Sequence, residues 1–154
     1  MRAALAPALA ALALAAGPAA QSVAQSAAQT TGPTPSSPEW ITFQSPSGNI
    51  RCVMTDIGGT PSAACRLDEL TRTFDTPPDD CDGDWGAGFA VEADGPGRLS
   101  CYTDLPPEED ARVLPYGVAV QLAGITCASE RTGVTCTNEG GGGFSVRRAE
   151  QSLF

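Results

Sequence analysis

The cysteines of this chain follow a recurring local pattern that constrains how it can fold. Repeatedly, a glycine is followed within a few residues by an aliphatic residue, one further residue and a cysteine. Residues two apart on a β-strand point to the same face, so each aliphatic residue shares a face with its cysteine. The pattern predicts glycine turns that lead into strands with core-facing cysteines, at Gly48–Cys52, Gly97–Cys101, Gly124–Cys127 and Gly133–Cys136.

The N-terminal residues have the organisation of a secretory signal. Met1-Arg2 is followed by an alanine- and leucine-rich run to Ala16 and then by small residues and glutamines. Small residues at the third and first positions before the cut allow cleavage after Ala24, and also after Ala28. We therefore predict a signal peptide over residues 1–24 and a periplasmic or secreted protein. No span is expected in the mature chain, because no later segment approaches the roughly 20 apolar residues that a membrane span needs.

The mature chain divides into a polar segment and one folded domain. Residues 25–39 are rich in Gln, Ser, Thr and Pro and contain no large hydrophobic residue. Such a composition cannot bury enough surface to offset its ordering entropy, so we expect a disordered tether. The remaining residues, 40–154, are enough for one hydrophobic core and predict a single disulfide-rich β domain.

An exported chain with an even number of cysteines is expected to form disulfides and to leave no free thiol. The 6 cysteines allow many pairings. Pairing between sequence neighbours would staple hairpins, and each bridge would stabilise the fold by roughly 2–4 kcal/mol. We predict the pairs Cys52–Cys65, Cys81–Cys101 and Cys127–Cys136.

Alternation of apolar and polar residues recurs along the folded part and predicts short strands. Turn segments rich in Gly, Pro, Asn and Ser separate these stretches, at intervals typical of an antiparallel sandwich or small barrel. Helix is expected only as single turns near 68–72 and 108–112. The predicted core-facing sets are Ile41/Phe43, Ile50/Cys52/Met54, Ala63/Cys65/Leu67, Phe89/Val91, Val118/Val120/Leu122 and Phe144/Val146.

The segment Phe43–Cys52 resembles the F-x-S-P-S-G-N-I-x-C opening signature of an uncharacterised family of exported bacterial domains. Later landmarks agree in order: Asp84-Trp85-Gly86, Cys101 with Asp104, Leu114–Gly117, Gly133–Asn138 and Gly142–Arg147. The resemblance covers essentially the whole domain and implies an exported β domain without an assigned activity. The family often carries a histidine at the position of Gly143, so a function that needs that imidazole is not expected here.

The absence of histidine and lysine excludes several kinds of catalytic site. All 9 basic residues are arginines. Ser-His-Asp and Cys-His catalysis, Ser-Lys dyads, Schiff bases and histidine-bearing zinc sites are therefore excluded. The glycine run 140–143 is not followed by Lys-Ser/Thr and does not predict a phosphate loop. We expect no catalytic residues and no cofactor, although a pair of carboxylates among 18 acidic residues leaves a small hydrolase as an alternative.

One dense acidic cluster, residues 79–84, has the composition of a cation-binding loop. Ca²⁺ prefers several carboxylate oxygens held close together, which makes Asp80, Asp82 and Asp84 calcium candidates. The spacing does not fit an EF-hand, because Gly83 precedes the third acid and Val91 stands at the twelfth position. A solvated acidic loop held by Cys81 is the expected arrangement, with no bound metal.

Net charge and loop composition limit the partners. A formal charge of −9 disfavours nucleic acid and anionic membranes as partners and would attract a basic protein. Paired arginines at 147 and 148 are expected to form salt bridges, one of them facing outward and one facing the edge of the core. Our leading hypothesis is an exported, non-catalytic binding or envelope-structural module; an acidic inhibitor of a basic secreted enzyme, such as a cell-wall hydrolase, is the alternative. The candidate binding loops are 45–49 and 114–117, with Ser45, Ser47, Asn49 and Tyr116 as the residues to test.

Overall fold

A computed structural model describes residues 40–79, 81–101 and 111–154. The chain divides into two units, and all described residues belong to the second, Pro35–Phe154. The predicted signal peptide and tether lie outside the described residues. The described part contains β-strands and no helix, which confirms the all-β fold class.

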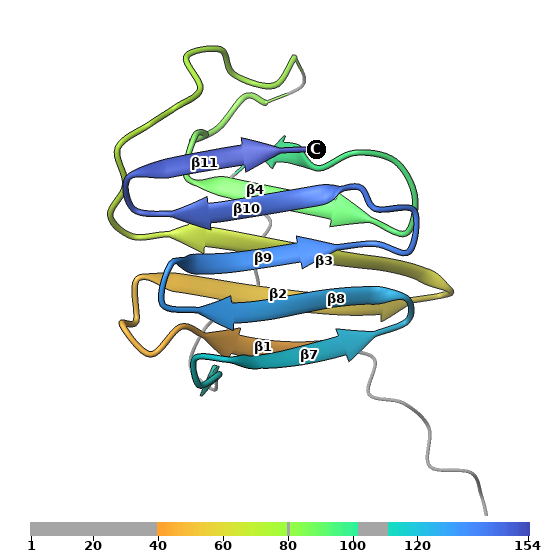
Figure 1. The fold of residues 1–154 in the computed structure, drawn as a ribbon. Coiled ribbons are helices and arrows are strands. Elements are labelled where there is room, and N and C mark those ends of the chain that lie inside the picture. Colours follow the sequence, from red (N-terminus) through yellow and green to blue (C-terminus); the bar gives the residue numbers. More distant parts are fainter. Residues whose placement is uncertain (1–39, 80, 102–110) are drawn as a thin grey trace, which may run out of the picture. The chain divides into compact units, whose positions relative to one another are not determined.

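Two sheets form the domain (Figure 1). Sheet A has six strands in the order β5-β4-β3-β2-β1-β6, and sheet B has five in the order β11-β10-β9-β8-β7. Neighbouring strands are antiparallel except β1 and β6, which are parallel. The strands are β1 (Trp40–Gln44), β2 (Ile50–Ile57), β3 (Thr60–Leu67), β4 (Gly88–Glu92), β5 (Arg98–Ser100), β6 (Arg112–Val113), β7 (Val118–Leu122), β8 (Ile125–Glu130), β9 (Gly133–Thr137), β10 (Gly143–Arg147) and β11 (Glu150–Leu153).

All three predicted disulfides are confirmed, and two of them lie in the core. Cys52 and Cys65 are direct cross-strand partners in sheet A, and Cys127 and Cys136 are direct partners in sheet B. The Sγ atoms of Cys65 and Cys136 lie 3.9 Å apart, so the two bridges meet where the sheets pack together. Both are buried, whereas Cys101 is half-buried and follows β5, contrary to the expectation that it faces the core from a strand.

The alternating residues of both sheets meet in one hydrophobic core. The rings of Phe89 in β4 and Phe144 in β10 are fully buried and lie 6.3 Å apart across the two sheets. Most of the predicted core sets are buried as expected, because alternate residues of each strand face the opposite sheet. In β7, however, Val118 is 42% exposed and only Leu122 is buried, because β7 is the edge strand of sheet B.

Backbone contacts join the two sheets on the side of β5 and β11. The amide of Gly97 donates to the carbonyl of Phe154 over 2.9 Å, and Phe154 exchanges two hydrogen bonds with Gly143. Near the same place, the buried Asn138 crosses between the sheets. Its Nδ2 donates to the carbonyls of Glu92 and Gly95, over 3.1 and 2.9 Å, and its Oδ1 accepts from the amide of Gly142.

Asn138 is therefore predicted to be a stabilising residue. Asn138→Ala should lower the free energy of unfolding by about 2–3 kcal/mol, because it removes a buried side chain and leaves three part-buried backbone groups without this partner. Denaturant unfolding under non-reducing conditions measures this loss. Asn49→Ala is the matched control: this asparagine also bonds backbone groups of a distant segment, but near the surface, and its loss should cost at most about 1 kcal/mol. Equal losses at the two positions would contradict the prediction.

Some local predictions were wrong. Residues 68–72 form a bend and irregular backbone, not a helical turn, because they cross from β3 toward sheet B, where the Thr71 amide donates to the carbonyl of Arg148. Of the segment 108–112, only its last two residues are described, and Arg112 begins β6. Arg147 and Arg148 both face outward: Arg147 pairs with Glu150, and Arg148 pairs with Glu69 over 2.9 Å.

Candidate functional site

The two candidate binding loops lie side by side at one end of the domain. β1 and β6 are parallel neighbours, so loops 45–49 and 114–117 leave the sheet at the same end. The Leu114 amide donates to the Gln44 carbonyl over 2.9 Å. Three further segments reach this end through contacts with those loops or with one another. We call the whole set the signature end; it consists of residues 45–49, 68–72, 114–117, 131–132 and 148–149.

Loop 45–49 uses most of its polar groups to hold itself together. Ser45 is only 4% exposed, and its Oγ accepts a 3.2 Å hydrogen bond from the amide of Ile50 and lies 3.0 Å from the Oγ of Ser47. The backbone of Ser45 also pairs with Ile50 and Gly48. Ser45 is therefore a structural residue, and only Pro46 and Ser47 are exposed at the tip of this loop.

Asn49 links this loop to the segment that follows β3. Its Nδ2 donates to the Glu69 carbonyl over 3.0 Å, and its Oδ1 accepts from the Glu69 amide over 2.8 Å. The Asn49 carbonyl also accepts from the amide of Asp68. Asn49 therefore positions residues 68–69, whose carboxylates pair with Arg51, Arg66 and Arg148.

Tyr116 is the most accessible aromatic side chain of the signature end. It is 37% exposed, and the guanidinium of Arg131 lies 5.2 Å from the centre of its ring. Arg131 comes from the turn between β8 and β9, and the Gly117 amide donates to the Ser129 carbonyl of β8 over 2.7 Å. An arginine over an exposed tyrosine presents a flat apolar surface beside a cation, which is a common combination at binding sites.

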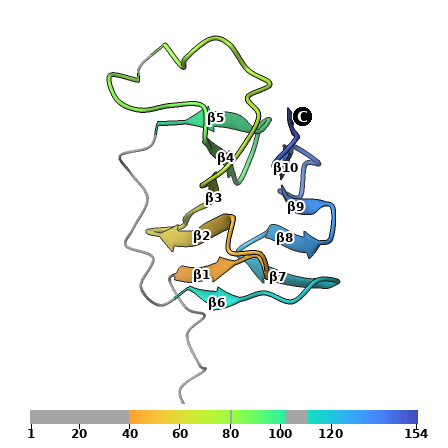
Figure 2. The same ribbon diagram turned by 90° about the vertical axis from the view of Figure 1, so that its left-hand side faces the viewer.

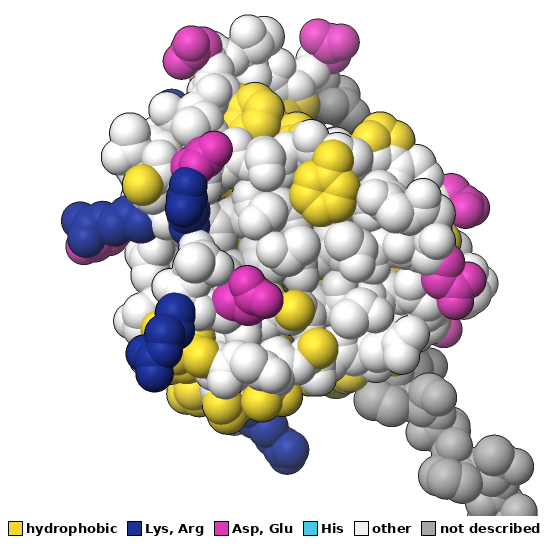
Figure 3. All heavy atoms as spheres, viewed as in Figure 1, with side chains coloured by type: hydrophobic (Ala, Val, Ile, Leu, Met, Phe, Trp, Pro, Cys, Tyr) yellow, Lys and Arg dark blue, Asp and Glu magenta, His cyan; other side chains and the backbone are white. Residues whose placement is uncertain are grey.

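Arginines gather at this end although the protein is acidic. In Figure 3, dark blue side chains lie at the left and at the bottom, whereas acidic side chains alone mark the right. The left is the end where β10 leads into β11 (Figure 1). Of the arginines in the described residues, Arg98 lies at the opposite end, paired with Glu92. Those at or next to the signature end are Arg51, Arg66, Arg72, Arg112, Arg131, Arg147 and Arg148.

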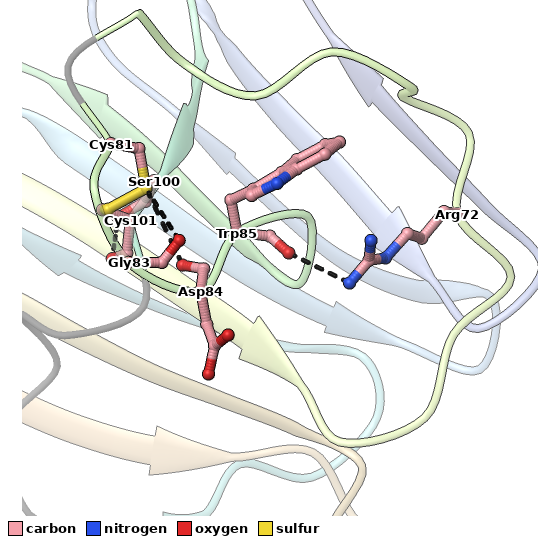
Figure 4. The surroundings of a disulfide bond; sticks show 7 residues. All are labelled: Arg72, Cys81, Gly83, Asp84, Trp85, Ser100 and Cys101. Carbon is pink, nitrogen blue, oxygen red and sulfur yellow. Dashed lines mark hydrogen bonds between the residues drawn. A yellow bond between two sulfur atoms is a disulfide. The ribbon is translucent and has the colours of Figure 1, made fainter.

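The acidic loop is arranged around the third disulfide (Figure 4). Cys81 is bonded to Cys101, and the side chain of Asp84 points away from the bridge. Asp82 and Asp84 are exposed, whereas Asp80 lies outside the described residues. Among the residues that the structure does describe, no group of three or more His, Cys, Asp or Glu side chains could hold a metal ion. The calcium alternative to a solvated loop is not tested, because it includes Asp80.

Trp85, at the end of this loop, pairs with an arginine. It is half-buried, and the guanidinium of Arg72 lies 5.2 Å from its ring centre and donates to the Trp85 carbonyl over 3.2 Å. This pair has the same separation as Arg131 and Tyr116, but it is tied down by the additional hydrogen bond to the backbone (Figure 4).

A comparison with protein families assigns the chain to a family. A family model described as a family of unknown function (DUF6636) matches residues 19–154. The chain belongs to this family. Comparisons with curated proteins and with solved structures each found no match.

The structure limits the chemistry of this DUF6636 domain. All six cysteines are in disulfides, so no thiol is available as a nucleophile. The disulfides also indicate an oxidising compartment. A side chain at Gly143 would begin 2.1 Å from the carbonyl oxygen of Cys136, so this backbone has no room for an imidazole there. In the described part of the chain, no helix is long and apolar enough to cross a membrane.

Sequence reasoning missed two side chains next to the candidate loops. Arg131 was part of a hairpin turn and carried no signal, because its contact with Tyr116 depends on how β7 pairs with β8. Arg112 was assigned to a helical turn, although it begins β6 beside Phe43. Only the short Arg-Val sequence could have indicated a strand, and two residues are too few for a pattern.

Proposed function

We propose that this DUF6636 protein is an exported, non-catalytic binding module that recognises its ligand with the signature end. The observation that carries the proposal is the exposed Tyr116–Arg131 pair beside loop 45–49. Disulfides hold both sheets beneath these loops, so the scaffold is rigid where the loops are presented. The missing histidine and lysine and the absence of free thiols support binding over catalysis.

The site suits recognition because its aromatic and cationic side chains are already held against each other. Tyrosine and arginine are enriched among the residues that dominate binding energy, and a stacked pair loses little side-chain freedom when it meets a ligand. The other charges of the signature end are mostly engaged in internal ion pairs, such as Arg148 with Glu69. The Tyr116–Arg131 pair is therefore the part of this end that we expect a ligand to contact.

The test is capture from an envelope extract of the producing cell with immobilised mature protein. Tyr116→Ala and Arg131→Ala should each reduce the specifically retained material by about tenfold or more. Arg98→Ala and Glu92→Ala are the controls, because they remove an exposed pair that contains an arginine at the opposite end of the domain. Equal retention by all four variants and the unmodified protein would contradict the proposal.

A further inference from the structure

β7 presents an edge of sheet B that lacks the usual protection against strand pairing. Exposed edges are commonly blunted by charged side chains, by proline or by shortness. Among the edge strands of the described residues, β5 has three residues with Arg98, β6 has two residues with Arg112, and β11 contains Glu150. β7 has five residues, Val-Ala-Val-Gln-Leu, with neither a charge nor a proline. Figure 3 shows hydrophobic side chains gathered along the lower edge, where β7 lies in Figure 1.

The backbone of β7 offers donors and acceptors at that edge. A two-residue turn with positive φ at Ala123 and Gly124 joins β7 to β8, with Leu122 opposite Ile125. In such a hairpin the pair that flanks the turn is hydrogen-bonded, and bonded pairs then alternate. Val120 therefore bonds to Cys127 of β8, whereas the N–H and C=O groups of Ala119 and Gln121 point away from β8.

The space beside β7 admits one strand. Contacts between Gly97 and Phe154 align the sheets on the side of β5 and β11, and sheet A has one strand more than sheet B. The unmatched strand is β6, and in Figure 2 β7 stands level with β1 while β6 lies below both. A strand added to β7 would cover the inner face of β6. A second copy of this domain would not fit in the same way, because its own β6 would meet this β6.

The uncovered face of β6 carries a positive charge. Arg112 is the in-register parallel partner of Phe43, whose side chain is buried in the core, so Arg112 lies on the face that points toward sheet B. It is exposed, because no strand of sheet B lies opposite β6. At the signature end, Arg131 extends from the turn between β8 and β9 to the ring of Tyr116, which lies between β6 and β7. A strand in this place would therefore be favoured by carboxylates that reach these two arginines.

We propose that β7 binds an extended acidic peptide segment of a partner protein by strand addition, with the peptide lying over Arg112 and ending at Tyr116 and Arg131. This inference rests on the proposed binding function and names its ligand class. Main-chain hydrogen bonds to Ala119 and Gln121 would supply affinity, and alternate side chains would supply specificity. Apolar residues would pack beside Val120, and acidic residues would pair with Arg112.

The probe is a random peptide library displayed on phage and selected on the purified mature protein. Enriched peptides should combine alternating apolar residues with Asp or Glu. Addition of such a synthetic peptide should slow hydrogen exchange at the amides of Ala119 and Gln121. The N–H of Gln121 points away from β8 and makes no bond to it. Gln121→Pro removes this N–H and should weaken the affinity for the peptide by about tenfold or more, whereas Gln121→Ala keeps it and should not. Arg112→Glu should reverse the preference between peptides with glutamate and with lysine.

N-methylation of the peptide provides a test that leaves the protein unchanged. Methyl groups on alternate amides that face β7 should abolish binding, whereas the same modification shifted by one residue should be tolerated. Failure to enrich any peptide, or enriched peptides that leave the exchange of Ala119 and Gln121 unchanged, would overturn strand addition. If enriched peptides leave that exchange unchanged but lose binding in Tyr116→Ala, strand addition is wrong and the proposed binding function of the signature end still stands. Dimerisation through β7 in analytical ultracentrifugation would overturn the choice of occupant.

Discussion

Replacement of Cys52 and Cys65 together by alanine is expected to lower the free energy of unfolding by about 3–5 kcal/mol. The bridge joins directly opposed residues of β2 and β3, and both cysteines are almost fully buried. Its loss releases a constraint on the unfolded chain and also removes buried sulfur atoms. One of them, Cys65 Sγ, lies 3.9 Å from Cys136 Sγ of the opposite sheet. The double variant therefore loosens the packing between sheets as well as one hairpin.

Denaturant unfolding without reductant measures this effect, and the third disulfide provides its control. Cys81 and Cys101 are only half-buried and bridge a sequence separation of 20, against 13 for Cys52 and Cys65. Chain entropy alone would make the loss of Cys81–Cys101 slightly more destabilising. We expect the opposite order, with a loss of about 2–3 kcal/mol for Cys81→Ala/Cys101→Ala, because no packed core is disturbed. A larger loss for the half-buried bridge would show that packing between the buried bridges contributes little.

Gly97→Ala is expected to destabilise the domain by about 2–4 kcal/mol. A Cβ atom at this position would lie 1.9 Å from the carbonyl oxygen of Gly143, which is backbone on the opposite sheet. Neither backbone segment can move without disturbing the hydrogen bond from the Gly97 amide to Phe154 and the paired bonds between Phe154 and Gly143. The substitution therefore pushes the two sheets apart at the point where Phe154 bonds to both Gly97 and Gly143.

Thermal unfolding compared with Gly140→Ala tests this prediction. A Cβ atom at Gly140 would meet only the Oδ1 of Asn138, at 3.4 Å, and the backbone there does not have positive φ. Gly140→Ala should therefore change the free energy of unfolding by less than about 1 kcal/mol. If Gly97→Ala were equally mild, the close approach of the two sheets at Gly143 would not be required for stability.

The comparison of sequence and structure shows which inferences local patterns allow. Alternation located β2 and β3 correctly, and the glycine–aliphatic–cysteine pattern located β8 and β9, because each of these strands has a buried face whose period is two residues. It did not locate β11, where polar residues dominate and Gln151 is buried because its side chain bonds to Thr73 and to the Arg147 carbonyl. It also assigned Val118 to the core, because periodicity does not distinguish an edge strand from a central one.

The candidate site was predictable only in part. The turn chemistry of Ser45–Asn49 indicated an ordered loop, and its proximity to Leu114–Gly117 follows from the parallel pairing of β1 and β6. That pairing could not be predicted, because β6 has two residues and its partner is far away in the sequence. The role of each loop residue could not be predicted either. Ser45 and Asn49 form hydrogen bonds within the domain, so the exposed pair at this end is Tyr116 of the neighbouring loop with Arg131.

The sequence by itself determined the β class, the three disulfide pairs and the exclusion of histidine- and lysine-dependent chemistry. These properties depend on residue type and on short spacings, which a linear pattern records directly. Only the tertiary structure decided that the two buried bridges touch, that the arginines collect at one end and that β7 is left as an unprotected edge. Each of these results depends on the order of strands in two sheets and on how those sheets face each other. Pairing and packing between distant segments decide that order, and a local sequence pattern carries no information about it.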